Sequence, residues 1–192
     1  MNTHKALGGE APAVRILKVG FNQDESCFSV AHERGFHVYS ADPVDVRVKR
    51  DFTRGAGSGS GIGVVGMLHR TNYLALVGGG RRPRFPNTRV VIWDDLKRKA
   101  LLLLDFMLPV LNVFLLRIKI VVALENQVLV YGFLSPPRKL AAYDLHNPCG
   151  LIAMASHPEG LILTFPARQT GQIQIVDIPL GVNGRSSVQI VR

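Results

Sequence analysis

The sequence predicts an all-β fold, and within that class a partial, WD40-like β-propeller of about four blades. Three observations lead to this prediction. Short apolar runs alternate with turns rich in Gly, Pro, Asn and Asp, the same order of runs recurs four times, and helical periodicity is weak along almost the whole chain. Antiparallel repeats of about 40 to 45 residues are typical of propeller blades, which stack side by side around an axis.

The repeat is most visible in its third apolar run, which ends in an aromatic or apolar residue. Aligning Tyr39, Trp93, Tyr131 and Val176 gives steps of 54, 38 and 45 residues. The long first step contains GAGSGSGIG, residues 55–63, which we expect to be a flexible insertion. A seven-bladed ring needs about 290 residues, so a chain of 192 residues supplies about four such blades.

Each repeat opens with one apolar run and continues through a second run, a tight turn and the third run. The opening runs start at Ile16, Val64, Val110 and Gly150. The turns and third runs occupy residues 29–42, 75–95, 121–133 and 162–178. A short helix over Arg98 to Phe106 remains an open alternative at this stage.

The third run of the second repeat is apolar on both sides of a strand. In VVIWDD, Val90 and Ile92 point one way, whereas Val91 and Trp93 point the other. A strand with two apolar faces lies between two covering layers. Each repeat is therefore expected to pack against its neighbours on both faces.

The predicted organisation is an N-terminal tail at residues 1–15, four blades at residues 16–178, and a tail or partial fifth blade at residues 179–192. In such an open array, the outer faces of the first and last blades have no neighbouring blade. Exposed apolar edges favour aggregation or pairing. We therefore expect poor solubility unless a partner or a second copy covers them.

The composition is that of a folded protein with an excess of positive charge. Hydrophobic residues make up 47% and charged residues 19%, and the formal net charge is +9. Such a charge favours nucleic acid, an anionic membrane or an acidic protein as partner. Eleven of the 23 cations are clustered, and a solvated rim and a phosphate-binding surface both explain them: Arg47, Lys49, Arg50, Arg54, Arg81, Arg82, Arg84, Arg89, Lys97, Arg98 and Lys99. Because no aromatic residues interleave with these cations to stack bases, nucleic acid is not expected.

No pattern in the chain predicts an enzyme, a cofactor or a metal. The string GIGVVG, residues 61–66, matches a dinucleotide fingerprint but lacks the strand before it and the helix after it, so we interpret it as a flexible loop. His32 and His37 lack metal-ligand spacing and are expected at the surface. No nucleophile motif is present.

Compartment and membrane signals are equally sparse. Cys27 and Cys149 lie far apart in the sequence, and the N-terminus has no apolar core of a signal peptide. Both observations favour a reducing, cytosolic compartment. The most apolar stretch, Leu101 to Leu116, is interrupted by polar residues and by proline. It is shorter than the ~18–20 apolar residues of a membrane span, so any membrane contact is expected to be peripheral.

Four strings in order resemble the PROPPIN family of seven-bladed, WD-repeat β-propellers. They are GFNQDESCFSVAHERGFHVYSADP, NYLALVGGGRRPRFPNTRVVIWDDLKRK, RIKIVVALENQVLVYGF and NPCGLIAMA with LTFPARQTGQIQIVD. The resemblance runs from about Val19 to Asp177 and is closer to the shorter, WD-repeat-45-like branch.

The resemblance implies a phosphoinositide effector in autophagy. The family binds phosphatidylinositol 3-phosphate and phosphatidylinositol 3,5-bisphosphate at two sites flanking an F/L-R-R-G motif. That motif does not occur in these residues, so no lipid-binding residue is transferred. The early blades of the family recruit a rod-shaped lipid-transfer protein of autophagy, which makes Asn22, Asp24, Arg81, Arg82 and Arg84 the candidate partner-binding residues.

The resulting hypothesis is a cytoplasmic scaffold that is peripheral on preautophagosomal, endosomal or vacuolar membranes. Two alternatives remain open. In the first alternative, the chain is a protein-interaction module that retains only the partner-binding blades. In the second, it is a nonfunctional fragment. Asn22 and Asp24 also fit a structural role, because Asn and Asp in turns often bond to their own backbone.

Overall fold

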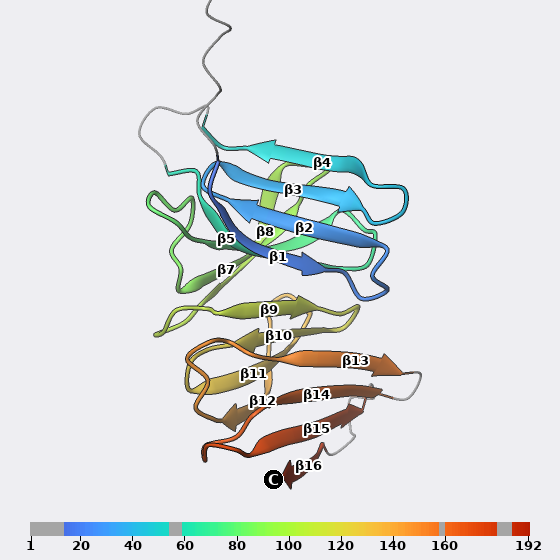
Figure 1. Cartoon of the computed structure of the whole chain (residues 1–192), viewed down its shortest axis with the longest axis vertical. Coiled ribbons are helices and arrows are strands. Elements are labelled where there is room, and N and C mark those ends of the chain that lie inside the picture. The colour runs from blue at the N-terminus through green and yellow to red at the C-terminus, as the bar shows by residue number, and fades with distance from the viewer. Residues whose placement is uncertain (1–13, 54–58, 158–159, 180–185) are drawn as a thin grey trace, which may run out of the picture.

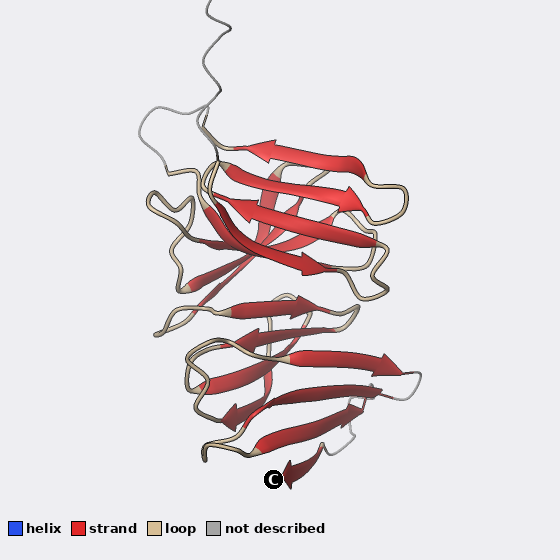
Figure 2. Ribbon diagram, viewed as in Figure 1, coloured by secondary structure: helices blue, strands red, loops and turns tan. Residues whose placement is uncertain are grey.

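Every regular element in the described part of the chain is a β-strand. The computed structural model describes residues 14–53, 59–157, 160–179 and 186–192, and no helix occurs among them (Figure 2). The strands form four antiparallel sheets of four strands each, in simple sequential order. We call these sheets blades 1 to 4, and Figure 1 shows them following one another from blade 1 in blue to blade 4 in red. The predicted all-β, four-bladed propeller arrangement is confirmed.

The strands of each blade run from the innermost to the outermost in chain order. Blade 1 contains β1 (Ile16–Phe21), β2 (Cys27–His32), β3 (Gly35–Ser40) and β4 (Asp45–Asp51). Blade 2 contains β5 (Ile62–Met67), β6 (Tyr73–Gly78), β7 (Arg89–Asp94) and β8 (Lys99–Asp105). Blade 3 contains β9 (Asn112–Leu115), β10 (Lys119–Ala123), β11 (Gln127–Gly132) and β12 (Lys139–Asp144). Blade 4 contains β13 (Ala153–His157), β14 (Gly160–Pro166), β15 (Ile173–Pro179) and β16 (Ser187–Val191).

Three hydrophobic clusters hold the array together, and each lies between two consecutive blades. Phe36 of blade 1 packs with Leu76 and Val91 of blade 2. The opposite face of blade 2 packs against blade 3, and a third cluster joins blade 3 to blade 4. Burying apolar surface stabilises a fold by roughly 25 cal/mol per Å². The contacts between blades are therefore the main source of stability.

The two-faced strand predicted at residues 90–93 is β7. Val90 and Ile92 belong to the cluster shared with blade 3, whereas Val91 and the partly buried Trp93 belong to the cluster shared with blade 1. Val90, Val91 and Ile92 are all fully buried. Because side chains alternate along β7, this one strand packs against both blade 1 and blade 3.

The outer faces of the two end blades expose large apolar side chains. Val19 and Phe21 on β1 are 52% and 62% exposed. On blade 4, Ile162 and Ile173 are 37% and 47% exposed. Blades 1 and 4 are therefore covered on one face, as expected for an open array.

Three segments differ from the sequence-based expectations. Residues 99–105, where a short helix remained open, form strand β8, because Val90, Val91 and Ile92 pair with Leu104, Leu103 and Leu102. Residues 187–191, expected as a tail or a partial fifth blade, form β16 and pair with β15 as the outermost strand of blade 4.

The glycine string expected as a flexible loop is mostly the innermost strand of blade 2. Ile62–Met67 form β5 and pair with β6. A Cβ atom on Gly66 would lie 2.7 Å from the Val113 carbonyl oxygen of blade 3. Glycine is needed here for close backbone approach and not for mobility. Residues 54–58 of the expected insertion, and residues 1–13 of the expected tail, lie outside the described residues.

One of the two histidines, His32, also differs from expectation, whereas His37 is partly exposed. His32 was expected at the surface, but it is only 5% exposed. Its Nδ1 accepts the Arg34 backbone N–H at 3.1 Å. The His32 and His37 rings meet edge to face, with centroids 4.7 Å apart. They lie on the outer face of blade 1, where β2 and β3 pair.

Candidate partner-binding site

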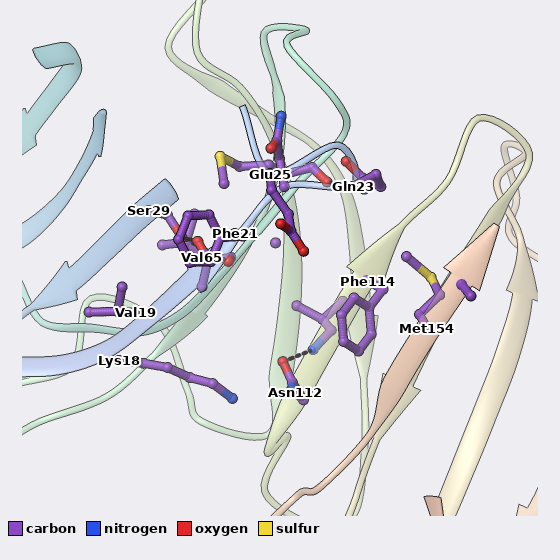
Figure 3. Close-up of a pocket in the computed structure, with 16 residues that line it drawn as sticks. Lys18, Val19, Phe21, Gln23, Glu25, Ser29, Val65, Asn112, Phe114 and Met154 are labelled. Atoms are coloured by element: carbon purple, nitrogen blue, oxygen red, sulfur yellow. Dashed lines mark hydrogen bonds between the residues drawn. The ribbon is translucent and has the colours of Figure 1, made fainter. Parts of the chain in front are cut away.

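An axial cavity of about 510 Å³ lies between the innermost strands of the four blades (Figure 3). Lys18 and Gln23 from blade 1, Asn112 from blade 3 and Met154 from blade 4 are among its lining residues. The Lys18 Nζ donates a hydrogen bond to the Leu111 carbonyl at 2.8 Å. Burial lowers the pKa of this lysine. Lys18 thus links β1 of blade 1 to the residue that precedes β9 of blade 3.

Asn22 closes the turn between β1 and β2. Its Oδ1 accepts the Cys27 backbone N–H at 3.0 Å, and its own backbone N–H donates to the Cys27 carbonyl at 2.9 Å. Its Nδ2 donates to the Ser26 Oγ at 3.2 Å. The same Nδ2 lies 3.4 Å from the His69 carbonyl of blade 2. Because Asn22 is 6% exposed and its side chain bonds to its own and the neighbouring turn, its contacts are those of a structural residue.

Gln23, which the sequence did not single out, connects three blades. Its Nε2 donates to the carbonyls of Met67 in blade 2 and Leu115 in blade 3, at 2.6 Å each. Its Oε1 accepts the His69 backbone N–H at 2.7 Å. No sequence signal marks this role, because the partners lie 44 and 92 residues away.

Asp24 is exposed at the tip of the same turn. Its Oδ1 accepts hydrogen bonds from the Ser26 hydroxyl at 2.5 Å and from the Ser26 backbone N–H at 3.2 Å. These bonds lower the pKa of Asp24, and the nearby Arg70 adds to the effect. The Arg70 Nε in turn donates to the Ser26 Oγ at 2.8 Å. Asp24, Ser26 and Arg70 therefore form a polar chain across the boundary between blades 1 and 2.

A second cavity, of about 390 Å³, opens at this boundary. It combines apolar and charged lining residues: Cys27, Val38, Ser40, Asp42, Arg47, Val48, Met67, His69, Arg70, Thr71, Asn72, Leu74 and Asp95. Arg50 and Asp95 bridge the two blades next to it through two hydrogen bonds of 2.6 Å. The boundary thus offers a fixed recess with charges of both signs at its rim.

Arg81, Arg82 and Arg84 occupy the loop between β6 and β7. The Arg81 backbone N–H donates to the Glu33 Oε2 at 2.9 Å, and the Arg82 carbonyl accepts backbone N–H groups from Ser60 and Gly61. The side chains of Arg81 and Arg82 are exposed. The Arg84 guanidinium lies 5.5 Å from the centre of the Phe52 ring. The loop is thus fixed by its backbone and presents Arg81 and Arg82 to solvent.

The five candidate residues form two separate sets. In each blade the first and third turns leave from one end of the strands, and the second turn leaves from the other end. Asn22 and Asp24 lie in a first turn, whereas the three arginines lie in a second turn. The structure brings together the members of each set but places the two sets at opposite ends of the blades.

Neither set resembles a metal site. In the described ranges, no group of three His, Cys, Asp or Glu side chains is arranged to hold a metal ion. The same ranges include no helix with the length and hydropathy of a membrane span.

Comparison with known proteins identifies relatives of this fold. No family model matches the chain. SVP1-like protein 2 of Debaryomyces hansenii is 47% identical over 223 residues, which cover 100% of this chain and 51% of that protein. Hsv2 of Kluyveromyces lactis superposes with a TM-score of 0.71 at 24% identity, covering 92% of this chain and 50% of that structure.

A third similar structure is KlAtg21 in its complex with the coiled coil of AgAtg16. It has a TM-score of 0.63 at 22% identity, and the match covers 85% of this chain and 52% of that structure. The chain therefore spans about half the length of the relatives it matches. The chain is therefore similar in sequence to SVP1-like protein 2 and similar in fold to Hsv2 and Atg21, which agrees with the predicted resemblance to the PROPPIN family of β-propellers.

Proposed function

We propose that this chain acts in autophagy as part of a phosphoinositide effector and scaffold, in which blades 1 and 2 bind a protein partner. The PROPPIN family consists of scaffold and binding proteins, not enzymes. KlAtg21 was solved with a coiled-coil partner, which supports protein recruitment by a propeller of this shape. The proposed location is cytoplasmic and peripheral on preautophagosomal, endosomal or vacuolar membranes.

The observation that carries the proposal is the recess between blades 1 and 2. Its rim carries Asp42, Arg47 and Arg70, and exposed Asp24 lies next to Arg70. A recess of about 390 Å³ is in the size range of sites that hold a few side chains of a ligand. A peptide segment with an apolar residue between charged ones fits these features. The proposed partner is the rod-shaped lipid-transfer protein of autophagy.

A pull-down with that lipid-transfer protein tests the proposal. Because Asp24 is exposed, Asp24→Lys should leave the fold intact and weaken capture by at least about tenfold, as truncation of a charged interface contact does. Glu125→Lys is the matched control, because Glu125 is an exposed carboxylate in the opposite end of blade 3. Equal capture by Asp24→Lys and the wild-type chain would overturn the assignment of this site.

The second set of candidates has its own test. Arg81→Glu with Arg82→Glu reverses two exposed charges at the other end of blade 2. Loss of capture in this variant, with Asp24→Lys unaffected, would move the partner site to the loop between β6 and β7.

Flotation with vesicles containing phosphatidylinositol 3-phosphate separates the open alternatives. Phosphoinositide-dependent flotation supports the effector. Partner capture without flotation supports a protein-interaction module, and the absence of both supports a nonfunctional fragment.

A further inference from the structure

One end of blades 2 and 3 carries three exposed apolar tips. Leu96, in the turn between β7 and β8, is 80% exposed, and Leu134, in the turn between β11 and β12, is 69% exposed. Ile118, between β9 and β10, is 47% exposed, and the Ile118 carbonyl accepts the Phe133 backbone N–H at 2.8 Å. Neither the axial cavity nor the recess between blades 1 and 2 includes these side chains. The three tips lie in three separate turns.

Six exposed cations flank the tips. They lie in the same turns or at the first residue of the strand that follows: Lys97, Arg98, Lys99, Arg117, Arg138 and Lys139. Among the described residues, none of the six is within ion-pair distance of a carboxylate. The cations are thus available to an external anion.

The only carboxylates in these turns are occupied inside the protein. Asp94 is 1% exposed and accepts hydrogen bonds from Asn72 and from the backbone N–H groups of Leu96 and Lys97. Asp95 is 7% exposed and bonded twice to Arg50. The turns of blade 3, residues 116–118 and 133–138, contain no acidic residue. The end of blades 2 and 3 is therefore strongly positive at its surface.

At the opposite end of the same blades, some cations are paired with carboxylates. There Arg89 pairs with Asp105 in blade 2 at 2.6 Å. At the boundary between blades 3 and 4, Arg168 pairs with Asp144 at 2.6 Å.

Exposed apolar residues also occur at that opposite end, such as Met107 at 97%. Arg81 and Arg82 are exposed at that end too. Within the described ranges, the two ends of blades 2 and 3 therefore differ in the number of exposed cations without a carboxylate in ion-pair distance, which is larger at the end with the three tips.

We propose that the third turn of blade 2 and the first and third turns of blade 3 form a membrane-contact surface for anionic lipid bilayers, with Leu96, Ile118 and Leu134 entering the interface and the six cations binding lipid phosphates and carboxylates. Lys and Arg near an anionic membrane each contribute attraction at its surface, and apolar side chains add affinity when they are buried in the interface. A fluid bilayer accommodates separate tips, whereas a helical protein partner needs a continuous apolar groove.

This surface shares no apolar tip and no cation with the proposed partner site, because none of these nine side chains lines the recess or belongs to the candidate partner-binding residues. It also needs no phosphoinositide. Its failure would leave the recess between blades 1 and 2, and its partner, unaffected.

Vesicle sedimentation with the 192-residue chain tests the surface. We expect binding to vesicles of phosphatidylcholine with phosphatidylserine, no binding to phosphatidylcholine alone, and weaker binding at high salt because salt screens exposed charges. Lys97→Glu with Arg98→Glu should weaken binding by at least about tenfold. Leu96→Ser with Leu134→Ser should weaken it by about fivefold or more.

Two control variants carry the same changes at the other end of the blades. Arg15→Glu with Arg192→Glu matches the charge reversal, since both residues are exposed at that end of blades 1 and 4, and Met107→Ser with Leu151→Ser matches the apolar loss, since Leu151 is 61% exposed. Both controls should bind within about twofold of wild type, and circular dichroism should show an unchanged fold in all four variants. The proposal is overturned by absence of binding to phosphatidylserine vesicles, by equal losses in the controls, or by full binding of the leucine variant.

Discussion

Blade 2 and blade 1 are built from the same four-stranded sheet, but they differ in how many of their faces are covered. Blade 2 has apolar clusters on both sides, so Val90, Val91 and Ile92 are all fully buried. Blade 1 buries one face against blade 2 and leaves Phe21 on its other face 62% exposed. Blade 2 therefore buries apolar side chains on two faces and blade 1 on one, so blade 2 is expected to contribute more to stability.

The largest expected loss of stability comes from a cavity in blade 2, which is covered on both faces. Ile92→Ala removes a fully buried side chain between blades 2 and 3 and should lower the free energy of unfolding by about 2–5 kcal/mol. Ile173→Ala on the outer face of blade 4, 47% exposed, should cost less than about 1 kcal/mol. Urea denaturation measures both. Equal losses would mean that the outer face of blade 4 is covered in solution.

The next effect concerns the ion pair that joins blade 1 to blade 2. Asp95→Asn removes the charge from the two 2.6 Å bonds to the Arg50 guanidinium, and it should cost about 1–3 kcal/mol because Asp95 is nearly buried. Asp105→Asn is the control. The Arg89–Asp105 pair lies within blade 2, and its carboxylate side chain is 62% exposed, so its loss should cost below about 1 kcal/mol. Chemical denaturation of the two variants should separate them, and a larger loss for Asp105→Asn would contradict the ranking.

A smaller effect is expected at Gln23, which links blade 1 to blades 2 and 3. Gln23→Ala leaves the carbonyls of Met67 and Leu115 without this donor and should cost about 1–2 kcal/mol. Gln127→Ala removes an exposed bond to Asp144 inside blade 3 and should change stability by less than about 0.5 kcal/mol. Thermal denaturation by circular dichroism checks both, and identical midpoints would show that Gln23 contributes no link between blades.

The smallest effect is a pH dependence confined to the open face of blade 1. Burial lowers the pKa of both His32 and His37 below the usual 6.5, and the mutual proximity of the rings contributes at His32. The unfolded chain therefore binds more protons than the folded chain as the pH falls below 6.5, so stability is complete above this pH and decreases below it. Arg34, Lys49 and Asp51 also face this pair.

His32→Gln provides the comparison for this pH effect, because glutamine keeps an acceptor for the Arg34 N–H but does not titrate. The loss of thermal stability between pH 7.5 and pH 5 should be smaller in His32→Gln than in wild type. An unchanged loss would assign the pH dependence to other groups.

The fold was predictable wherever a strand is buried on both faces. The alternation of Val90, Val91, Ile92 and Trp93 predicted a strand between two layers, and the structure confirms it. The outermost strands were not predictable in this way, because β8 is mostly exposed and buries only Leu104, with Leu102 partly buried, which is too few positions to create a pattern. The run of leucines in β8 left a helix open for the same reason.

The candidate site was predictable only as far as local turn chemistry extends. Asn22 and Asp24 were assigned to a turn, and their bonds to Ser26 and Cys27 lie within five residues of sequence. Gln23 could not be predicted, because its partners in blades 2 and 3 are brought to it only by the stacking of the blades. The separation of the two candidate sets likewise follows from strand direction and not from residue type.

The three clusters between blades have a further consequence for how this chain opens. Because each hydrophobic cluster joins only two consecutive blades, the array behaves approximately as a one-dimensional chain of units. Releasing blade 4 breaks one cluster, whereas releasing blade 2 breaks two. Local opening should therefore begin at the two ends and move inward, so that amide protons of β7 and β10 exchange with deuterium last.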